Sequence, residues 1–441
     1  MLEKETMSIG LKPKTGYRWV ILFVLWLLYL INYLDRTSVL TLLPVIRTDL
    51  HITHEQAGLI ASIFFVGYAI AQVLAGMLAD RIGAKRVMSI AIIIFTFVTF
   101  ATGLVRSFST FVLLRLGLGI GEGCHFAPAS RTIADWFPNN EKGRATSLFT
   151  TTFQVGPAVI PILATSLATF FGSWRPVFFV LGIPGLIGIF MLWYYVTNTP
   201  EEELRNKGRI SKEEYDYILS NLNTTKSETK KMATTKALKV LFTDISFIAY
   251  CLILFFNLAV IWGELVWISS FLYEQHGFSL KAMGFMASVP SLIAIVALVL
   301  GGWLMDKVFH GKAKWILAIG FLPCVPIFFL LSSVPKGHIF LLTVALLLMG
   351  FFSNIQGGAL YTYPQMRFPK QMVGTAIGIS NGFGQLGSFL APFAAGFLVK
   401  TSASGAVSYN NVFIMFAGMA LIAGVLSLFL SEKPKVVESL E

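Results

Sequence analysis

Apolar runs, each long enough to cross a lipid bilayer, recur along this sequence from Trp19 to Leu430 and leave few folds open to it. A helix needs roughly 20 apolar residues to span a membrane. The composition agrees, because 55% of the residues are hydrophobic and 13% are charged, whereas a soluble protein carries about a quarter charged residues. The pattern predicts an all-α membrane protein with twelve transmembrane helices, at 19–43, 57–79, 87–105, 109–130, 145–171, 176–197, 246–273, 282–305, 315–333, 338–363, 372–399 and 411–430.

One long polar segment, residues 198–245, divides the predicted spans into six and six. Its first part, "TPEEELRNKGRISKEEYDY", mixes charges as a surface helix does, and its second part, "NTTKSETKKMATTK", is typical of a flexible linker. We therefore predict a cytoplasmic head, a six-helix bundle, a cytoplasmic linker, a second six-helix bundle and a cytoplasmic tail, at 1–18, 19–197, 198–245, 246–430 and 431–441.

The net charge of +11 indicates membrane topology rather than nucleic-acid binding. Of the 34 Lys and Arg residues, 26 fall in the head, the tail and the loops on the same side of the predicted membrane. Loops rich in Lys and Arg stay in the cytoplasm, so both termini are predicted to be cytoplasmic. The first apolar run has no A-x-A-like cleavage site and is predicted to be a span rather than a signal peptide. The opposite side holds six basic residues, one in each loop: Arg47, Arg106, Arg175, Lys281, Lys336 and Lys400.

The sequence offers no pattern for a metal, a cofactor or enzyme catalysis. The three cysteines, Cys124, Cys251 and Cys324, lie in apolar spans at unrelated spacings, which favours neither disulfides nor a zinc site. No nucleophile and base stand in a recognisable arrangement. We therefore expect a protein that is not an enzyme and that binds no cofactor or metal.

The two halves of the chain repeat one another in sequence. The segment "GMLADRIGAKR" at 76–86 is echoed by "GWLMDKVFHGKAK" at 302–314, and "FPNNEKGRA" at 137–145 is echoed by "FPKQMVGTA" at 368–376. Each pair falls in equivalent loops of the two halves. Repeats of this kind are typical of transporters in which two bundles rock about a central site.

"GMLADRIGAKR" resembles, throughout its length, the G-x-L-x-D-R-x-G-x-K/R loop of the major facilitator superfamily. The resemblance covers the whole chain and implies that family's fold of two six-helix bundles. It also implies that Asp80 caps a neighbouring helix and holds the inward gate closed, with Arg81 and Arg86 beside it. In the second copy Lys307 replaces Arg and two residues are inserted, so the matching role of Asp306 rests on a weaker motif.

Five strongly ionisable residues fall inside predicted spans: Asp35, Arg36, Arg115, Glu122 and Glu264. Charges at such depth cost several kcal/mol unless they are paired or hydrated, and they usually mark a substrate or ion path. Asp35 and Arg36 point about 100° apart on their helix and cannot satisfy each other well. Asp35 or Glu122 is therefore expected to find an arginine across a helix interface. The alternative is a purely structural salt-bridge network, although apolar residues would usually stabilise the protein as well.

The segments "NYLDR", "GYAIAQVLAG", "RLGLGIGEG" and "DWFP" resemble the anion:cation symporter branch of that family. This branch includes bacterial hexuronate, galactonate and glucarate permeases and the sialin and vesicular glutamate carriers. The resemblance implies that two acids handle the proton, Asp35 and Glu122, and that Arg115 pairs with these acids. It implies that Arg36 binds the substrate carboxylate. Arg115 is also predicted to bind substrate, because arginines supply the paired donors that a carboxylate or phosphate needs. Further substrate-binding positions are Tyr68, Gln154 (one position away from the expected site), Tyr361 (where sugar-acid permeases carry Trp) and Asn381.

Two residues fall outside this pattern. Glu264, in "IWGELVWISSFLY", could contact a substrate hydroxyl or a cationic group, carry a second proton, pair with the other half, or be a protonated, hydrogen-bonded structural residue. His125 could relay protons, but a hydrogen-bonded packing role is the more common use of such a histidine. The aromatic residues near Glu264, including Trp262, suit either sugar stacking or ordinary packing.

We therefore predict a multi-pass transporter of the bacterial plasma (inner) membrane that acts as a monomer in the lipid bilayer. It would import a small organic anion, a sugar acid of the hexuronate, aldonate or aldarate type, together with a proton, with sodium as the alternative cation. Three other functions stay open: an organophosphate exchanger of the same fold, a drug/proton antiporter, and a transporter-like sensor. The antiporter is disfavoured because "TFQVGPAVIP" keeps only Gly156 and Pro157 of the expected motif, and the sensor because the chain carries no large cytoplasmic domain.

Overall fold

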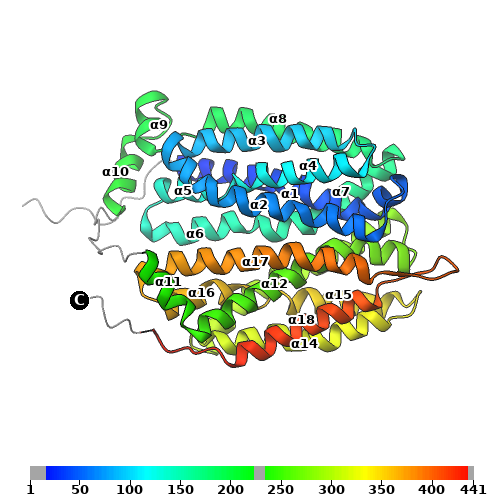
Figure 1. The fold of residues 1–441 in the computed structure, drawn as a ribbon. Helices are drawn as coiled ribbons and strands as arrows, with labels where there is room; N and C mark the ends of the chain where they lie inside the picture. The colour runs from blue at the N-terminus through cyan, green and yellow to red at the C-terminus, as the bar shows by residue number, and fades with distance from the viewer. Residues whose placement is uncertain (1–15, 223–233, 436–441) are drawn as a thin grey trace, which may run out of the picture.

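Long helices form two groups that lie side by side along the molecule (Figure 1). The computed structural model describes residues 16–222 and 234–435. Most of the predicted head, the middle of the linker and the end of the tail lie outside this part of the chain. The first group, called here the N-terminal half, holds α1 (Tyr17–Asp49), α2 (His54–Ile82), α3 (Ala84–Thr102), α4 (Phe108–Gly123), α5 (Phe126–Trp136), α6 (Asn139–Thr150), α7 (Thr152–Phe171) and α8 (Arg175–Tyr195).

The second group, the C-terminal half, begins after the connecting helices α9 (Pro200–Asn206), α10 (Lys212–Asn221) and α11 (Thr234–Phe242). A π-helical segment and a short hairpin lie at the end of the molecule opposite α9 and α10. We call that end the far end, and the end that carries α9–α11 the linker end. The C-terminal half contains α12 (Ile245–Ser270), η1 (Phe271–Gln275), α13 (Leu280–Lys307), α14 (Ala313–Ser333), α15 (Ile339–Phe352), α16 (Gly357–Arg367), α17 (Lys370–Leu398), β1 (Lys400–Thr401), β2 (Val407–Ser408) and α18 (Asn410–Leu428).

The helices agree with the expected all-α membrane fold. Ten helices within the described ranges are long and apolar enough to cross a bilayer. Large apolar side chains such as Val73, Phe97 and Phe340 are strongly exposed, a surface that suits lipid rather than water. The count of twelve spans stays a prediction, because two expected spans are not among these ten: 109–130, which is divided between α4 and α5, and 372–399, which corresponds to α17.

Two helices are interrupted at matching places in the two halves. In the N-terminal half, α4 ends at Gly123 and α5 begins at Phe126, and the backbone N–H of His125 donates to the carbonyl of Glu122 across the break. In the C-terminal half, α15 ends at Phe352 and α16 begins at Gly357. Interrupted membrane helices leave backbone groups without helical partners, and transporters place their binding sites at such points.

The repeat seen in the loops extends into the helices that precede them. Thr53 caps α2 and Ser279 caps α13, 226 positions later, the same separation as Asp80 and Asp306. Five and nine residues further on, Gly58 and Ser62 are matched by Gly284 and Ser288, and each serine hydroxyl donates to the carbonyl of its glycine. The two halves are thus built on one plan.

These two glycines lie where the halves touch near the far end. A Cβ atom at Gly58 would lie 2.9 Å from the carbonyl oxygen of Pro392 on α17. A Cβ at Gly284 would lie 2.7 Å from the carbonyl oxygen of Pro161 on α7. Both contacts cross from one half to the other, so only glycine allows the helices to approach this closely.

A polar cluster also joins the halves at the far end. Glu274 of η1 accepts hydrogen bonds from Arg47 Nε of α1 at 2.9 Å and from the Tyr409 hydroxyl at 2.6 Å, and lies 2.9 Å from His54 Nε2 of α2. We call Arg47, His54, Glu274 and Tyr409 the far-end cluster. Within residues 16–222 and 234–435, the ion pairs that join the two halves lie in this cluster.

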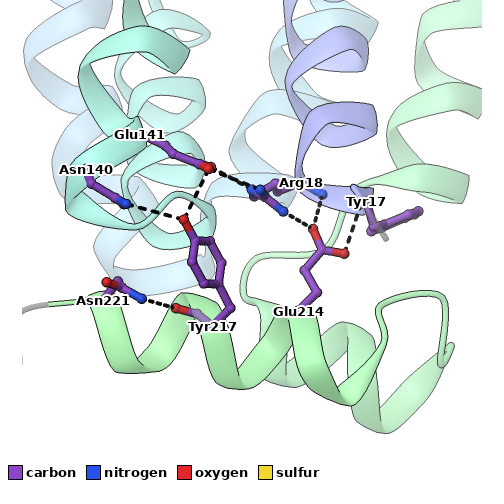
Figure 2. Close-up of polar contacts among 7 residues, drawn as sticks. All are labelled: Tyr17, Arg18, Asn140, Glu141, Glu214, Tyr217 and Asn221. Carbon is purple, nitrogen blue, oxygen red and sulfur yellow. Dashed lines mark hydrogen bonds and ion pairs between the residues drawn. The ribbon is translucent and has the colours of Figure 1, made fainter. Parts of the chain in front are cut away.

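The first part of the connector is helical, as the charge pattern predicts, and it packs on the N-terminal half (Figure 2). The carboxylate of Glu214 on α10 accepts from the backbone N–H groups of Tyr17 and Arg18, at 3.0 and 3.2 Å. These are first-turn groups of α1 that have no helical partner. Arg18 also pairs with Glu214 and with Glu141 of α6, each at 2.8 Å. The contacts fix α10 against the N-terminal half.

Candidate functional site

A buried ion pair between Arg36 of α1 and Glu122 of α4 is the centre of the candidate site. Arg36 donates from Nε and Nη2 to the same oxygen of Glu122, at 2.9 and 2.6 Å. Arg36 is 3% exposed and Glu122 is 0% exposed. The pair forms because α4 turns Glu122 toward α1 two residues before its break. The expectation that an intramembrane acid finds an arginine across a helix interface is thus confirmed for Glu122.

Aromatic rings enclose the guanidinium of Arg36. Its Cζ lies 5.1 Å from the ring centre of Tyr33, 4.4 Å from Phe64, 4.9 Å from Tyr68 and 5.3 Å from Trp262. Trp262 belongs to α12, so the C-terminal half supplies one wall of this enclosure. A cation surrounded by ring faces is stabilised electrostatically and shielded from water. The structure thereby joins Tyr68, a predicted substrate contact, directly to Arg36.

Arg115 makes no ion pair with an acid among the described residues. Its Nε donates to the carbonyl of Ile60 at 3.1 Å, and both terminal nitrogens are buried without a hydrogen-bond partner in the part of the chain described. Glu122 follows Arg115 by two helical turns, roughly 10 Å of rise. Arg36 holds Oε2 of Glu122, and Oε1 is buried without a partner among the described residues. The expected pairing of Arg115 with an acid is therefore not made here, and two N–H₂ groups remain free to donate.

Asp35 completes a set of four charged side chains. It is 3% exposed, and its Oδ1 is buried without a partner among the described residues. Its charged neighbours are Glu122 and Arg115, rather than the adjacent Arg36. We call Asp35, Arg36, Arg115 and Glu122 the charged cluster. When all four are ionised, its two acids balance its two bases.

Further polar groups of α1 lie buried in the same half and were not singled out by the sequence. Neither polar atom of the Asn32 side chain has a partner in the described chain, and the same holds for the hydroxyls of Thr37 and Ser38. A run of unpaired polar atoms in the interior is costly unless water or a ligand reaches it. In the sequence, these residues could have been identified by their position within one helical turn of Asp35 and Arg36. His125 is 0% exposed and lies between the rings of Tyr29 and Phe95, which matches a packing role. The expected hydrogen bond is not made among the described residues, because both ring nitrogens are buried without a partner.

The C-terminal half faces this cluster with uncharged groups. Gln154 of α7 donates through Nε2 to Asn354 Oδ1, 3.2 Å away in the α15–α16 break. The assignment of Gln154 as a polar group near the site gains support from this contact between the halves. In the same break, Gln356 donates to Asn257 Oδ1 of α12 at 3.2 Å and to the carbonyl of Ser353 at 2.8 Å.

Glu264 also lies at this break rather than beside Arg36. Its Oε2 accepts from the hydroxyl of Ser353 at 3.2 Å, and the residue is 8% exposed. Trp262, two residues earlier on α12, points toward Arg36, and a separation of two residues turns a helix by about 200°. Of the roles left open for Glu264, the structure shows the hydrogen bond to a neighbouring helix. Glu264 forms no ion pair with the other half among the described residues.

Two predicted substrate contacts are not in hydrogen-bonding contact with the charged cluster. Tyr361 of α16 is 48% exposed, and Asn381 is partly buried on α17. Neither side chain makes a hydrogen bond to Asp35, Arg36, Arg115 or Glu122 within the described residues. Their assignment as substrate-binding residues stays a prediction.

The predicted gating residues lie at the linker end. Asp80, after the last turns of α2, pairs with Arg131 of α5, and Arg131 also lies 3.8 Å from Asp135. Arg81, Arg86 and Asp306 are exposed. Asp80 thus contacts a neighbouring helix of its own half through an arginine side chain. Its roles in capping a helix and in closing a gate stay predictions.

Solved structures identify the fold. The chain matches a bacterial homologue of the lysosomal transporter Spinster in an inward-facing, occupied conformation with a TM-score of 0.77 and 19% identity, over 97% of this chain and 100% of that one. It matches a D-xylose–proton symporter with a TM-score of 0.73 and 16% identity, over 95% of this chain and 100% of that one. The architecture is therefore the helical fold of these membrane transporters.

The chain belongs to the Major Facilitator Superfamily, whose profile matches residues 25–392. It is 28% identical to the "Probable sulfoacetate transporter SauU" of Cupriavidus necator, over 96% of this chain and 95% of that protein. It is 28% identical to the "Hexuronate transporter" of Bacillus subtilis, over 92% of each chain, and 25% identical to the "Probable L-galactonate transporter" of Escherichia coli, over 94% of this chain and 89% of that protein. The chain is thus a multi-pass membrane transporter and not an enzyme, as the sequence predicts.

Proposed function

We propose that this protein imports a sugar acid together with a proton across the bacterial inner membrane, as a monomer, with both termini in the cytoplasm. The observation that carries the proposal is the buried ion pair between Arg36 and Glu122, enclosed by aromatic rings from both halves. The named relatives that transport hexuronate and galactonate support this substrate class. Alternating access would come from rocking of the two halves about the charged cluster.

The ion pair offers a direct means of coupling. Arg36 cannot bind a substrate carboxylate well while Glu122 occupies its Nε and Nη2. When Glu122 takes up a proton, its charge disappears, and Arg36 becomes free to bind a carboxylate through the same two donors. Proton binding and substrate binding therefore favour each other to the same extent. Asp35, in the field of the same cluster, is the second acid that can carry the proton.

The charge balance of the cluster favours one proton for each singly charged anion. With two acids and two bases, the ionised cluster is neutral before substrate arrives. A monoanion alone would leave one uncompensated negative charge in a buried site, which is costly. One proton on Glu122 or Asp35 restores the balance. A bound sodium ion would also restore the charge balance. A sodium ion needs several oxygen ligands around one point, however, whereas Glu122 and Asp35 each lie beside an arginine.

An organophosphate exchanger is the second candidate, and one observation favours it. The guanidinium groups of Arg36 and Arg115 both lie close to the ring of Phe64. Their Cζ atoms are 4.4 and 5.0 Å from the centre of this ring. Two guanidinium groups so placed could hold a phosphate. Such an exchanger would need no proton, so the two functions differ in their response to a pH gradient.

The test begins with thermal-shift screening of sugar acids, dicarboxylates and sugar phosphates on the purified protein. Each compound that stabilises the protein is then tested for uptake into proteoliposomes with and without an inward proton gradient. We expect a sugar acid to bind and to accumulate only with the gradient. Binding of sugar phosphates alone, with exchange that ignores the gradient, would establish the second candidate and refute the first.

A further inference from the structure

We infer that the site accepts acids with one anionic group and a hydroxylated, uncharged remainder, and that it discriminates against acids charged at both ends. This inference rests on the proposed function and decides a point that the relatives leave open. Their names include galactarate and glucarate, which carry two carboxylates, sulfoacetate, which carries a sulfonate and a carboxylate, and hexuronate and galactonate, which carry one.

The cations of the site come from one half alone. Arg36 and Arg115 belong to α1 and α4 of the N-terminal half and are 3% and 1% exposed. Among the described residues of α12–α18, Arg367 is the buried lysine or arginine, and it lies at the linker end, paired with Asp244 at 2.7 Å. It also donates to Ser431 and to the backbone of Lys433, so its charge is already used. The C-terminal half therefore presents no free buried cation in the part of the chain described.

The polar groups that the C-terminal half places near the interface are amides, hydroxyls and one acid, and several of their N–H and O–H groups already donate within that half. Asn354 directs its Oδ1 toward Gln154 of the other half, and Glu264 has one oxygen hydrogen-bonded to Ser353 while the residue remains 8% exposed. On α17, Gln385 has a buried Oε1 without a partner among the described residues. Acceptors of this kind suit the hydroxyl groups of a sugar acid, which can donate. A second carboxylate can donate nothing when ionised, so these acceptor oxygens offer it no hydrogen bond.

The charged cluster can compensate one negative charge of the substrate for each proton that Glu122 or Asp35 takes up. Protonation of Glu122 frees Arg36, and the free N–H₂ groups of Arg115 share the field of Asp35. A carboxylate at this end of the substrate is therefore compensated. A second anionic group, a sugar length away in the C-terminal half, would be buried without a counter-charge and in the field of Glu264. An unpaired buried charge is among the most destabilising arrangements in a protein.

The experiment compares acids that share one carbon skeleton. Binding of D-galactonate and D-galactarate, which differ in a terminal CH₂OH against a carboxylate, is measured by thermal shift and calorimetry on the full-length protein at one pH. D-Glucuronate and D-glucarate form a second pair. We expect the singly charged member of whichever pair binds to bind at least tenfold more tightly. Equal affinity, or tighter binding of the doubly charged member, overturns the inference but leaves the proposed function standing. If no acid of either pair binds, the proposed function falls, and the inference falls with it.

A matched pair of variants tests the electrostatic cause. Glu264→Gln removes the acid but keeps a group that can contact Ser353, and Ser353→Ala removes the hydrogen bond but keeps the acid. We expect Glu264→Gln to reduce the penalty on the doubly charged acid severalfold and Ser353→Ala to leave that ratio unchanged. A greater penalty in Glu264→Gln, or an equal reduction in both variants, contradicts the assignment of the discrimination to charge.

Discussion

The two halves of this transporter share a scaffold but differ in what they bury at its centre. Each half has an interrupted helix, α4–α5 in one and α15–α16 in the other, and each has a capped helix with the same G-x-x-A-S segment. Beside the first break lies the ion pair of Arg36 and Glu122. Beside the second break lie amides, hydroxyls and one acid, Glu264.

The difference indicates a division of labour. Each half has one interrupted helix, and transporters place their binding sites at such interruptions. The two arginines of the charged cluster and the two acids that balance them, all expensive to bury, belong to one half. The proton-coupled step can then take place inside the N-terminal half, while the C-terminal half reads the remainder of the substrate and moves relative to it.

The largest effect is expected from Glu122→Gln, which removes one acid of the charged cluster in the N-terminal half. The amide imitates the protonated acid but cannot release a proton, so this variant should bind substrate with weak pH dependence and exchange labelled substrate. It should fail to accumulate substrate against a gradient. Asp35→Asn should share this loss if both acids carry protons. The comparison is Glu264→Gln, which should still accumulate substrate, although its affinity can change.

Proteoliposome uptake with and without a proton gradient measures this difference. Concentrative, pH-driven uptake by Glu122→Gln would show that the proton travels elsewhere. Loss of accumulation in Glu264→Gln alone would move the coupling step to the C-terminal half and reverse the comparison.

A smaller effect is expected from Arg36→Lys, which keeps the charge but loses the planar pair of donors. Binding should weaken by about 1–3 kcal/mol, the loss expected for a charge-assisted fork. Calorimetric titration with the acid found by screening measures the change, and circular dichroism confirms that the variant is folded. Arg106→Lys, the same substitution at an exposed loop position, is the control. Near-normal affinity in a folded Arg36→Lys protein would remove Arg36 from the substrate site.

The contact between the halves can be loosened at the far end by Glu274→Gln. The carboxylate loses its charge while Arg47 and His54 of the other half remain, so the far-end-closed state should lose about 1–3 kcal/mol relative to the far-end-open state. Distances between spin labels at Leu104 and Ile339, in a background without the native cysteines, should shift toward longer values. Tyr409→Phe removes a hydrogen bond within the C-terminal half and should change the distribution less. An unchanged distribution in Glu274→Gln would show that packing at Gly58 and Gly284, rather than charge, holds this end closed.

The sequence predicted the parts of this arrangement that depend on local pattern. Apolar runs indicated the helices, and the rarity of charge in those runs identified Asp35, Arg36, Arg115, Glu122 and Glu264. The conflict between neighbouring Asp35 and Arg36 was visible from the 100° turn per residue, and an arginine partner for Glu122 followed from the cost of burial.

Pairings across helices depend on rotations and depths that no single helix encodes. The resemblance implies that Arg115 pairs with an acid, but in the structure Arg36 makes the pair with Glu122. The sequence alone does not distinguish the two arginines as partners of Glu122. The same reason explains why Glu264 was grouped with substrate contacts, although it turns toward Ser353. The helix breaks were missed because Cys124 and Ser353–Gln356 contain no proline, and their apolar surroundings read as continuous spans.

The smallest effect is expected from the loop at the linker end, and it compares the two copies of one motif. Asp80 pairs with Arg131 of α5, whereas Asp306, its partner in the repeat, is exposed and forms no ion pair within the described ranges. If Asp80 contributes to the closed inner gate, Asp80→Asn should overpopulate the state that is open at the linker end and slow transport, with ligand affinity less affected. Because its ion pair is largely exposed, the free-energy change should be about 1 kcal/mol or less. Asp306→Asn should change transport less, since its copy of the motif has lost the following arginine.

Initial uptake rates, together with alkylation of a cysteine introduced in the linker-end vestibule, measure both effects. Equal behaviour of the two variants would show that the repeat is functionally symmetric at this end, in contrast to the charged centre of the molecule.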